Sequence, residues 1–365
     1  MNLKRYGVAV AILATAAISL TACASNEAAP AATSTSSATS TPATGTLNGS
    51  GSSAQANAET AWVAGFQEAN PAATINYASV GSGAGVAAFI SGGMQFAGSD
   101  AALTDAQLAG TFTGCAAGAK GIDIPNYIAP IAVAFNLKGV KTLNLDATTI
   151  ANIFNGKIKT WNDPAIAADN PGVTLPATAI VPVHRSDSSG TTNNFTDYLA
   201  KAAPAAWPQA ANNVFPYPGE AAAQNAGVAS AAEAAEGSIA YLEASNTGTL
   251  SVAKLKVGST YVAYTPKAAA AVVDASPLVA SREANDLAFN IDRTTTAKGA
   301  YPLVLVSYFI ACQKYTDPAV ASLVKAYASY VTSPAGQQVA AKSVNSAPLS
   351  ASLTAKVATS IASIK

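Results

Sequence analysis

A short apolar run, a turn rich in Gly, Ser or Asp, and a helical pattern follow one another four times along this chain. The four stretches begin at Thr44 (TGTLNGSGSSAQANAETAWVAGF), Thr74 (TINYASVGSGAGVAAFI), Met94 (MQFAGSDAALTDAQL) and Thr178 (TAIVPVHRSDSSGTTNNFTDYL). Strands that alternate with helices in this way predict an α/β fold with parallel sheets. The third stretch also contains a capping box from Thr104 to Gln107, which predicts the start of a helix there.

The four turns are predicted to lie together and to hold a small anion. Ligands of such sheets bind beyond the carboxyl ends of the strands. Helix N-termini at that edge present unpaired N–H groups and the positive end of the helix dipole. Each turn taken alone is better explained by good capping and turn residues, but four of them with one arginine and one aspartate favour an anion site.

Arg185 is the residue best suited to bind a tetrahedral oxyanion, because its planar guanidinium offers a fork of donors. Asp187 follows two positions later and would partly neutralise this charge, so dipoles would supply most of the recognition. The alternative is an ordinary ion pair that stabilises the end of a strand.

The charge balance and the motifs argue against a nucleic-acid-binding protein and against an enzyme. Twenty basic residues balance twenty acidic ones, and nucleic acid requires a cationic surface. Gly156-Lys157 lacks the Walker-loop context, GSGAGV ends in valine where a dinucleotide fingerprint has glycine, and no Gly-x-Ser-x-Gly is present. A Ser/His/Asp triad would need His184, the only histidine, which should point away from Arg185 along a strand. We therefore expect neither catalysis, nor a cofactor, nor a metal.

The N-terminus is predicted to be an export signal with a lipid attachment site. Residues 1–22 combine early positive charges with an apolar run. The LTAC at positions 20–23 resembles the lipobox of bacterial lipoproteins, in which the cysteine, here Cys23, is lipidated. The alternative is an ordinary signal peptide with an incidental cysteine. Residues 23–45 are rich in Ala, Ser, Thr and Pro and are predicted to be a flexible tether. No other apolar run is long enough to span a membrane, so the membrane is reached through the lipid only.

Cys115 and Cys312 are the cysteines that remain in the exported part. In an exported protein two thiols favour a disulfide over a metal site, which would need further Cys or His ligands. Two free buried cysteines are the alternative.

From about Leu47 onward the chain resembles PstS, the phosphate-binding subunit of bacterial ABC phosphate importers. The matching segments follow the family order and include NGSGSSAQ, INYASVGSGAGV, FAGSDAALTDAQL, TIANIFNGKIKTWNDPAI, VHRSDSSGTTNNFTDYL and GSIAYLEAS. The resemblance implies a type II periplasmic-binding-protein fold, with two α/β lobes that are joined by two crossing strands and close on one phosphate. It also implies a monomeric, extracytoplasmic protein whose partner is an ABC permease. A protein for another oxyanion (sulfate or molybdate) and an exported phosphate-handling enzyme or sensor on the same fold are the alternatives.

The resemblance also implies a set of ligands for phosphate. The first lobe contributes the Ser53 hydroxyl, the Ala54 N–H, Ser82 and Asp100, and the second contributes Arg185, Ser189, the Gly190 N–H and Thr191, with Asp187 paired to the arginine. Asp100 would accept the proton that phosphate carries and sulfate lacks. Its alternative role is to cap the following helix.

Two positions depart from the family pattern. Ala54 stands where many relatives have an aromatic residue, which removes a cover over the anion. Ser188 stands where glycine is usual, which is expected to stiffen the turn.

The two long apolar runs NYIAPIAVAFNL and AYPLVLVSYFIAC are predicted to be the crossing strands. Lobe 1 would then comprise residues 46–130 and 302–365, and lobe 2 residues 131–301. Cys115 and Cys312 would both lie in lobe 1 near the hinge, so a bridge between them is geometrically reasonable.

Overall fold

The computed structural model describes residues 42–365. The predicted signal, Cys23 and most of the predicted tether lie outside the described residues. Strand β1 begins at Gly45, so the last residue of the range predicted as tether belongs to the sheet.

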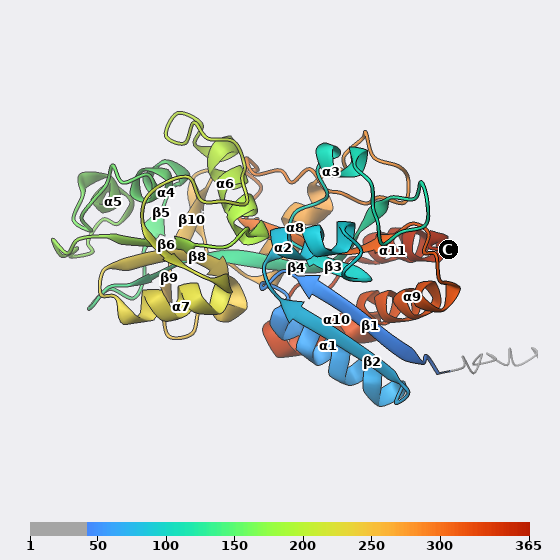
Figure 1. Cartoon of the computed structure of the whole chain (residues 1–365). Helices are drawn as coiled ribbons and strands as arrows, with labels where there is room; N and C mark the ends of the chain where they lie inside the picture. The colour runs from blue at the N-terminus through green and yellow to red at the C-terminus, as the bar shows by residue number, and fades with distance from the viewer. Residues whose placement is uncertain (1–41) are drawn as a thin grey trace, which may run out of the picture. The chain divides into compact units, whose positions relative to one another are not determined.

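Strands and helices alternate over much of the described chain, which ends in three consecutive helices (Figure 1). The first group of elements is β1 (Gly45–Gly51), α1 (Ala56–Ala69), β2 (Ala73–Ser79), α2 (Ser82–Ile90), β3 (Phe96–Ser99), α3 (Asp105–Ala109) and β4 (Gly121–Asn136). The second is β5 (Asn144–Leu145), α4 (Ala147–Phe154), α5 (Pro164–Asp169), β6 (Val181–Arg185), α6 (Gly190–Ala202), β7 (Glu220–Ala222), α7 (Gln224–Ala234), β8 (Ser238–Glu243), the 3-10 turn η1 (Ala244–Asn246), β9 (Ser251–Val252), β10 (Lys254–Val257), β11 (Thr260–Val262) and α8 (Pro266–Ala275). The last is β12 (Val304–Cys312), α9 (Pro318–Thr332), α10 (Pro334–Val344) and α11 (Ala351–Ser363).

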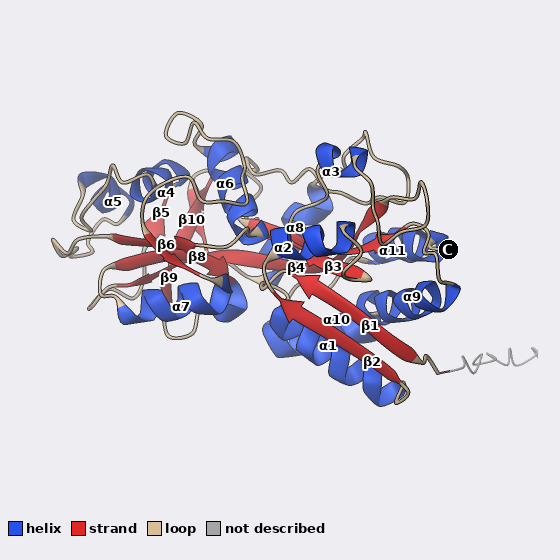
Figure 2. Cartoon of the chain, viewed as in Figure 1, coloured by secondary structure: helices blue, strands red, loops and turns tan. Residues whose placement is uncertain are grey.

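Nine strands form one sheet in the order β2-β1-β3-β12-β4-β8-β6-β7, with β9 also paired to β4. Figure 2 shows the strands in red. The pairs β1–β2, β1–β3, β6–β7 and β6–β8 are parallel, as the repeated strand–turn–helix pattern predicts. The pairs that involve β12 with β3 or β4, and β4 with β8, are antiparallel. The sheet is therefore mixed rather than parallel throughout.

Strand β4 connects the two halves of this sheet, because it changes partner partway along its length. Residues 121–130 pair with β12, whereas residues 131–136 pair with β8. Fifteen of its sixteen residues are buried, which explains the nearly continuous apolar run in the sequence. We call the strands on the β12 side, with their helices, lobe 1, and those on the β8 side lobe 2. The type II periplasmic-binding-protein fold expected from the sequence is thus present.

The second crossing differs from its prediction. The run from Ala300 to Cys312 was expected to be one strand, but β12 begins only at Val304. Pro302 has no N–H to give to a sheet, which favours an irregular segment here. The segment is still tied to β4, because the Ile131 N–H donates to the Leu303 carbonyl at 2.9 Å.

Helix α2 also begins earlier than the sequence suggests. The Gly-rich run Gly81–Gly85 was expected to be a turn, but the helix starts at Ser82. A Cβ atom added at Gly85 would lie 2.3 Å from the Gly51 Cα, so this glycine allows the helix to pack closely on β1. Gly85 is thus needed for packing, whereas Gly81, with φ of 91°, provides the turn before the helix.

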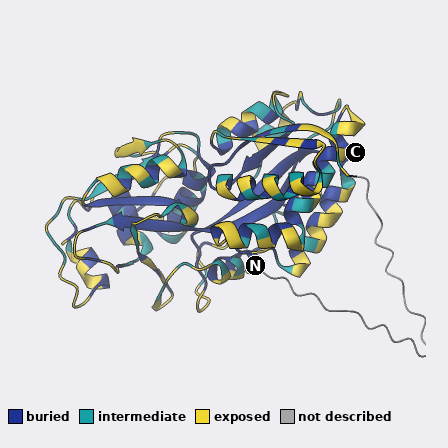
Figure 3. Ribbon diagram, turned by 90° about the horizontal axis from the view of Figure 1, so that it is seen from below, coloured by how far each residue is buried: buried dark blue, intermediate teal, exposed yellow. Residues whose placement is uncertain are grey.

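The helices bury one side against the sheets and expose the other (Figure 3). Trp62 and Phe66 of α1 are buried, as their spacing predicts. In α6, the residues buried as their spacing predicts are Phe195, Tyr198 and Leu199. The capping box of Thr104 and Gln107 is present at the start of α3. None of the helices within residues 42–365 is long and apolar enough to cross a membrane.

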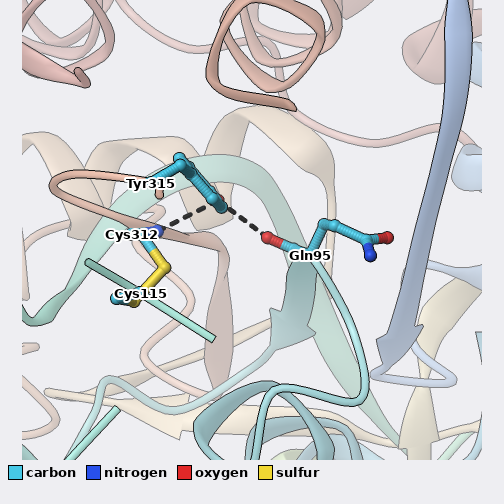
Figure 4. The surroundings of a disulfide bond; sticks show 4 residues. All are labelled: Gln95, Cys115, Cys312 and Tyr315. Carbon is cyan, nitrogen blue, oxygen red and sulfur yellow. Dashed lines mark hydrogen bonds between the residues drawn. A yellow bond between two sulfur atoms is a disulfide. The ribbon is translucent and has the colours of Figure 1, made fainter. Parts of the chain in front are cut away.

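Cys115 and Cys312 form a disulfide bond in lobe 1 (Figure 4), which is the predicted pairing. Cys312 is the last residue of β12, and its N–H donates to the Tyr315 hydroxyl at 3.0 Å. That hydroxyl donates in turn to the Gln95 carbonyl at 2.7 Å, just before β3. The bridge therefore connects the end of the crossing strand to a loop 197 residues earlier.

Candidate anion-binding site

The loops predicted to hold an anion come from both lobes and contact one another. In lobe 1 they follow β1 and β3 and precede α2, and in lobe 2 the loop joins β6 to α6. The Gly83 N–H donates to the Ser188 carbonyl at 3.0 Å, and Asn194 Nδ2 donates to the Asp100 carbonyl at 2.6 Å. The structure thus brings the first-lobe loops directly against the second-lobe loop.

Asp100 lies at the centre of this contact, and its two carboxylate oxygens have different surroundings. Oδ1 accepts hydrogen bonds of 2.5 Å from both Ser52 and Ser307. Oδ2 accepts only longer ones, 3.5 Å from Ser82 and 3.3 Å from Thr191. Oδ1 is therefore fully bonded within the protein, while Oδ2 faces two of the predicted phosphate ligands.

Burial raises the pKa of Asp100, because only 3% of the residue is exposed. The hydrogen bonds from Ser307 and Ser52 and the nearby charge of Arg185 oppose this rise. Burial therefore favours the neutral carboxyl, whereas these hydrogen bonds and Arg185 favour the carboxylate.

Arg185 is the last residue of β6 and is 2% exposed. Its Nε donates to Asp187 Oδ1 at 2.7 Å, its Nη2 pairs with Asp187 Oδ2, and its Nη1 lies 3.4 Å from Thr191 Oγ1. Partial burial alone would raise the pKa of Asp187, but the hydrogen bonds and charge of Arg185 lower it below its usual value. The predicted pairing of these two residues is present, and Nη1 is directed toward the predicted ligands.

Helix α6 places its N-terminus against Asp100. The Ser189 hydroxyl caps the helix by accepting from the Thr192 N–H at 3.1 Å. A Cβ atom added at Gly190 would lie 2.7 Å from both the Asp100 Cβ and the Ser82 Oγ. Only glycine allows the helix end, with its free N–H groups, to come this close to lobe 1.

Ser53 and Ala54 lie in the same loop but make different contacts from the other predicted ligands. The Ser53 hydroxyl accepts from the Asn225 N–H at 3.2 Å and from Asn225 Nδ2 at 3.1 Å. The Ala54 N–H donates to the Ser52 hydroxyl at 3.0 Å. Both residues are buried at the edge of the cluster around Asp100.

Ser188 does not require the backbone freedom of the glycine that is usual at its position. Its φ is not positive, since the only non-glycine residues of the described chain with positive φ are Gln224 and Asn345. Its carbonyl accepts the cross-lobe hydrogen bond from Gly83.

Ser52 and Ser307 are site residues that sequence reasoning missed. Ser52 was overlooked because it directly precedes the predicted ligand Ser53. Ser307 interrupts the apolar run VLVSYFIAC. A serine inside a fully buried strand could have indicated that its hydroxyl has a polar partner. The register of β12 on β4 shifts at this point, between Ser307 and Tyr308.

His184 takes no part in the site, as its place in the strand predicts. Its ring stacks on Phe215 with a centroid distance of 4.6 Å. Its Nδ1 lies 3.0 Å from the Arg185 carbonyl. Within residues 42–365, no group of three or more His, Cys, Asp or Glu side chains is placed to hold a metal ion.

A cavity of about 660 Å³ lies beside the site, and Asp100, Asn194 and Arg293 are among the residues that line it. Of the predicted ligands, only Asp100 lines this cavity. The others are covered by the contact between the lobes.

Residues 36–335 match the family model of the PBP superfamily domain. Among curated proteins, phosphate-binding protein PstS 3 of Mycobacterium tuberculosis is 38% identical over 338 residues, which cover 90% of each chain. Phosphate-binding protein PstS 2 of the same organism is 35% identical over 373 residues and is covered, like this chain, over its full length.

Solved structures with a similar fold include the periplasmic phosphate-binding protein PfluDING bound with phosphate. Its TM-score is 0.71 at 23% identity, and the match covers 86% of this chain and 93% of that one. The phosphate-binding protein of Stenotrophomonas maltophilia gives a TM-score of 0.66 at 21% identity, with the same coverage. At these identities the likeness concerns the fold.

Proposed function

Because this chain belongs to the PstS family within the PBP superfamily, we propose that it binds inorganic phosphate between its lobes, outside the cytoplasmic membrane, and delivers it to the permease of an ABC importer. Relatives that share 35–38% of its sequence over most of their length are named phosphate-binding proteins. The proposal assigns no catalytic step to the chain.

The observation that carries the choice of phosphate is the asymmetry of Asp100. Its Oδ1 is bonded to two serines, while its Oδ2 receives only long contacts from Ser82 and Thr191. A ligand that accepts from these two hydroxyls and donates a proton to Oδ2 would satisfy all three groups. Near neutral pH phosphate still carries a proton, whereas sulfate carries none.

The remaining predicted ligands would complete the shell as donors. Arg185 Nη1, the N–H groups at the start of α6 and the Ser189 hydroxyl approach from lobe 2. The Ser53 hydroxyl and the Ala54 N–H approach from lobe 1, the latter by leaving its present contact with Ser52. Asp187 would hold the Arg185 guanidinium in place without touching the ligand.

The test is titration calorimetry of the exported part of the chain with phosphate and, separately, with sulfate and molybdate. Saturable binding of phosphate that an excess of sulfate does not displace is the expected result. Tighter binding of sulfate or molybdate would reassign the ligand. Catalytic release of phosphate from phosphomonoesters would replace the transport role with an enzymatic one.

We also propose that the mature chain is a monomer held at the membrane by a lipid on Cys23. The LTAC sequence supports the lipid anchor. Cys23→Ala is expected to move the protein from the membrane fraction to the soluble exported fraction. An unchanged distribution between the two fractions would contradict the anchor.

A further inference from the structure

Asn225 lies in lobe 2 and forms hydrogen bonds with the Ser53 hydroxyl of lobe 1. It is fully buried and is the second residue of α7. Both its backbone N–H and its side-chain Nδ2 donate to Ser53 Oγ, at 3.2 and 3.1 Å. A single residue of lobe 2 therefore provides two donors, one from its backbone and one from its side chain, to one predicted ligand of lobe 1.

The orientation of the Asn225 amide is fixed by its other end. Asn225 Oδ1 accepts from the backbone N–H of Glu243 at 2.9 Å. An N–H can only donate, so the oxygen must face Glu243 and the NH₂ group must face Ser53. The amide cannot turn round to accept a hydrogen bond from the serine.

This arrangement determines what the Ser53 hydroxyl can do. A hydroxyl has one hydrogen and two acceptor positions. Asn225 occupies both acceptor positions, so the hydrogen of Ser53 is left to donate to another group. The neighbouring Ser52 differs, because its hydrogen is already donated to Asp100 Oδ1 at 2.5 Å.

The backbone around Asn225 is held in place from several sides. Gln224 has φ of 62°, in the left-handed region that a non-glycine residue rarely adopts. Its N–H donates to Asp187 Oδ1 at 3.0 Å, and its Nε2 donates to the Ser79 carbonyl of lobe 1 at 2.6 Å. Such a conformation persists only where surrounding contacts stabilise it.

We propose that Asn225 is a positioning residue that makes Ser53 an obligatory hydrogen-bond donor to the bound anion when the lobes are together. The inference rests on the proposed phosphate-binding function. It links closure to recognition, because a donor of lobe 1 acquires its orientation from a residue of lobe 2. Within residues 42–365, Ser53 is the predicted ligand to which Asn225 is hydrogen-bonded, and Asn225 acts through it.

The test is a double-mutant cycle that measures phosphate affinity by calorimetry in the parent, Asn225→Ala, Ser53→Ala and the double variant. Loss of one oriented hydrogen bond is expected to weaken binding roughly 3- to 10-fold in each single variant. In the Ser53→Ala background, Asn225→Ala should change the affinity by less than about twofold. A purely structural role of Asn225 would instead give losses that multiply.

A second substitution covers the case in which Asn225→Ala does not fold. Asn225→Asp has nearly the same shape but places an acceptor where Nδ2 donates, so the Ser53 hydroxyl should turn toward the new carboxylate. The direct repulsion between that carboxylate and phosphate is the same with and without Ser53 and cancels in the cycle. The larger loss should therefore occur in the background that retains Ser53.

Gln224→Asn is the matched control, because asparagine tolerates left-handed φ but is too short to keep the contact with Ser79. It removes a cross-lobe hydrogen bond next to Asn225, and its effect should be the same with and without Ser53. Equal losses from Asn225→Ala in both Ser53 backgrounds, or an unaltered affinity in Ser53→Ala, would overturn the inference. Absence of phosphate binding by the parent would instead refute the proposed function.

Discussion

At the scale of single residues, Arg185 combines complete burial with a fixed orientation. Two of its nitrogens are engaged by Asp187, which leaves Nη1 for Thr191 and the proposed ligand. A buried guanidinium whose charge is only partly compensated attracts an anion strongly, since little water competes with it. This burial cannot be seen in the sequence. It is the reason for which we expect Arg185 to contribute strongly to anion binding.

Arg185→Ala is expected to weaken phosphate binding by about 2 to 5 kcal/mol, because it removes a desolvated, charge-assisted partner. Arg185→Lys should recover only part of this loss, since an ammonium cannot bind Asp187 through a fork. Calorimetry with phosphate measures both. Lys201→Ala, in the same lobe but more exposed, is the control for a general loss of positive charge. Equal affinities in the parent and Arg185→Ala would show that the β6–α6 loop is not the site.

Asp100→Asn is expected to reduce the preference for phosphate over sulfate. The Asn oxygen should take the place of Oδ1, because Ser52 and Ser307 both donate there, and its NH₂ group then replaces Oδ2. The NH₂ group of the variant can donate to sulfate, which is fully ionised, whereas the carboxylate of the parent repels sulfate. Competition titrations with sulfate measure the change, with the exposed Asp105→Asn as a control of equal charge. A variant that keeps the parental preference would leave Asp100 with a structural role only.

At the scale of elements, α1 carries a buried carboxyl group that is hydrogen-bonded to α9. Glu59 is 1% exposed, and its Oε2 accepts from the Tyr327 hydroxyl of α9 at 2.6 Å. Its Oε1 has no hydrogen-bond partner within the described residues. Burial raises the pKa of Glu59 to about 7, although the bond from Tyr327 opposes the rise.

Glu59→Gln is therefore expected to make the fold less sensitive to pH. A raised pKa means that the neutral form stabilises the folded state at low pH and that this stability is lost as the pH rises from 4.5 to about 7. The amide cannot ionise, so its advantage over the parent should grow across this range, up to about 3 kcal/mol. Urea unfolding at several pH values measures it, and Glu68→Gln in the exposed part of α1 is the control. Parallel pH profiles for parent and Glu59→Gln would contradict the prediction.

The local patterns predicted the elements better than their ends and their pairings. The strand–turn–helix units, the Thr104 capping box and the buried faces of α1 and α6 depend on neighbouring residues, so they are visible in the sequence. The early start of α2 and the late start of β12 depend on contacts with distant segments, such as the approach of Gly85 to Gly51. The same holds for the site, where Ser307 reaches Asp100 across 207 positions of sequence. The resemblance to PstS supplied the predicted ligands, but it gave no indication of Ser52, Ser307 or Asn225.

At the scale of the whole described chain, the cross-lobe contacts define a closed arrangement. Asp100, Ser82 and Ser53 of lobe 1 contact Gly190, Thr191 and Asn225 of lobe 2. We expect the lobes to separate without ligand, because these polar groups are then better hydrated apart. A ligand that contacts both lobes stabilises the closed form by its differential affinity for it. Small-angle scattering should show a smaller radius of gyration with saturating phosphate than without it.

Gly190→Ala tests whether this closure is required for binding. The added methyl group would lie 2.7 Å from the Asp100 Cβ and from the Ser82 Oγ, so the lobes could not come fully together. Alanine is a better helix former than glycine, so α6 and the fold of lobe 2 should be retained. We therefore expect a normal melting temperature, weaker phosphate binding and a radius of gyration that phosphate no longer reduces to the parental value. Gly227→Ala in α7 is the matched control, because its methyl group would meet the Ala222 Cβ at an ordinary 3.7 Å. Parental affinity and a parental change in radius for Gly190→Ala would mean that phosphate binds without bringing α6 against Asp100.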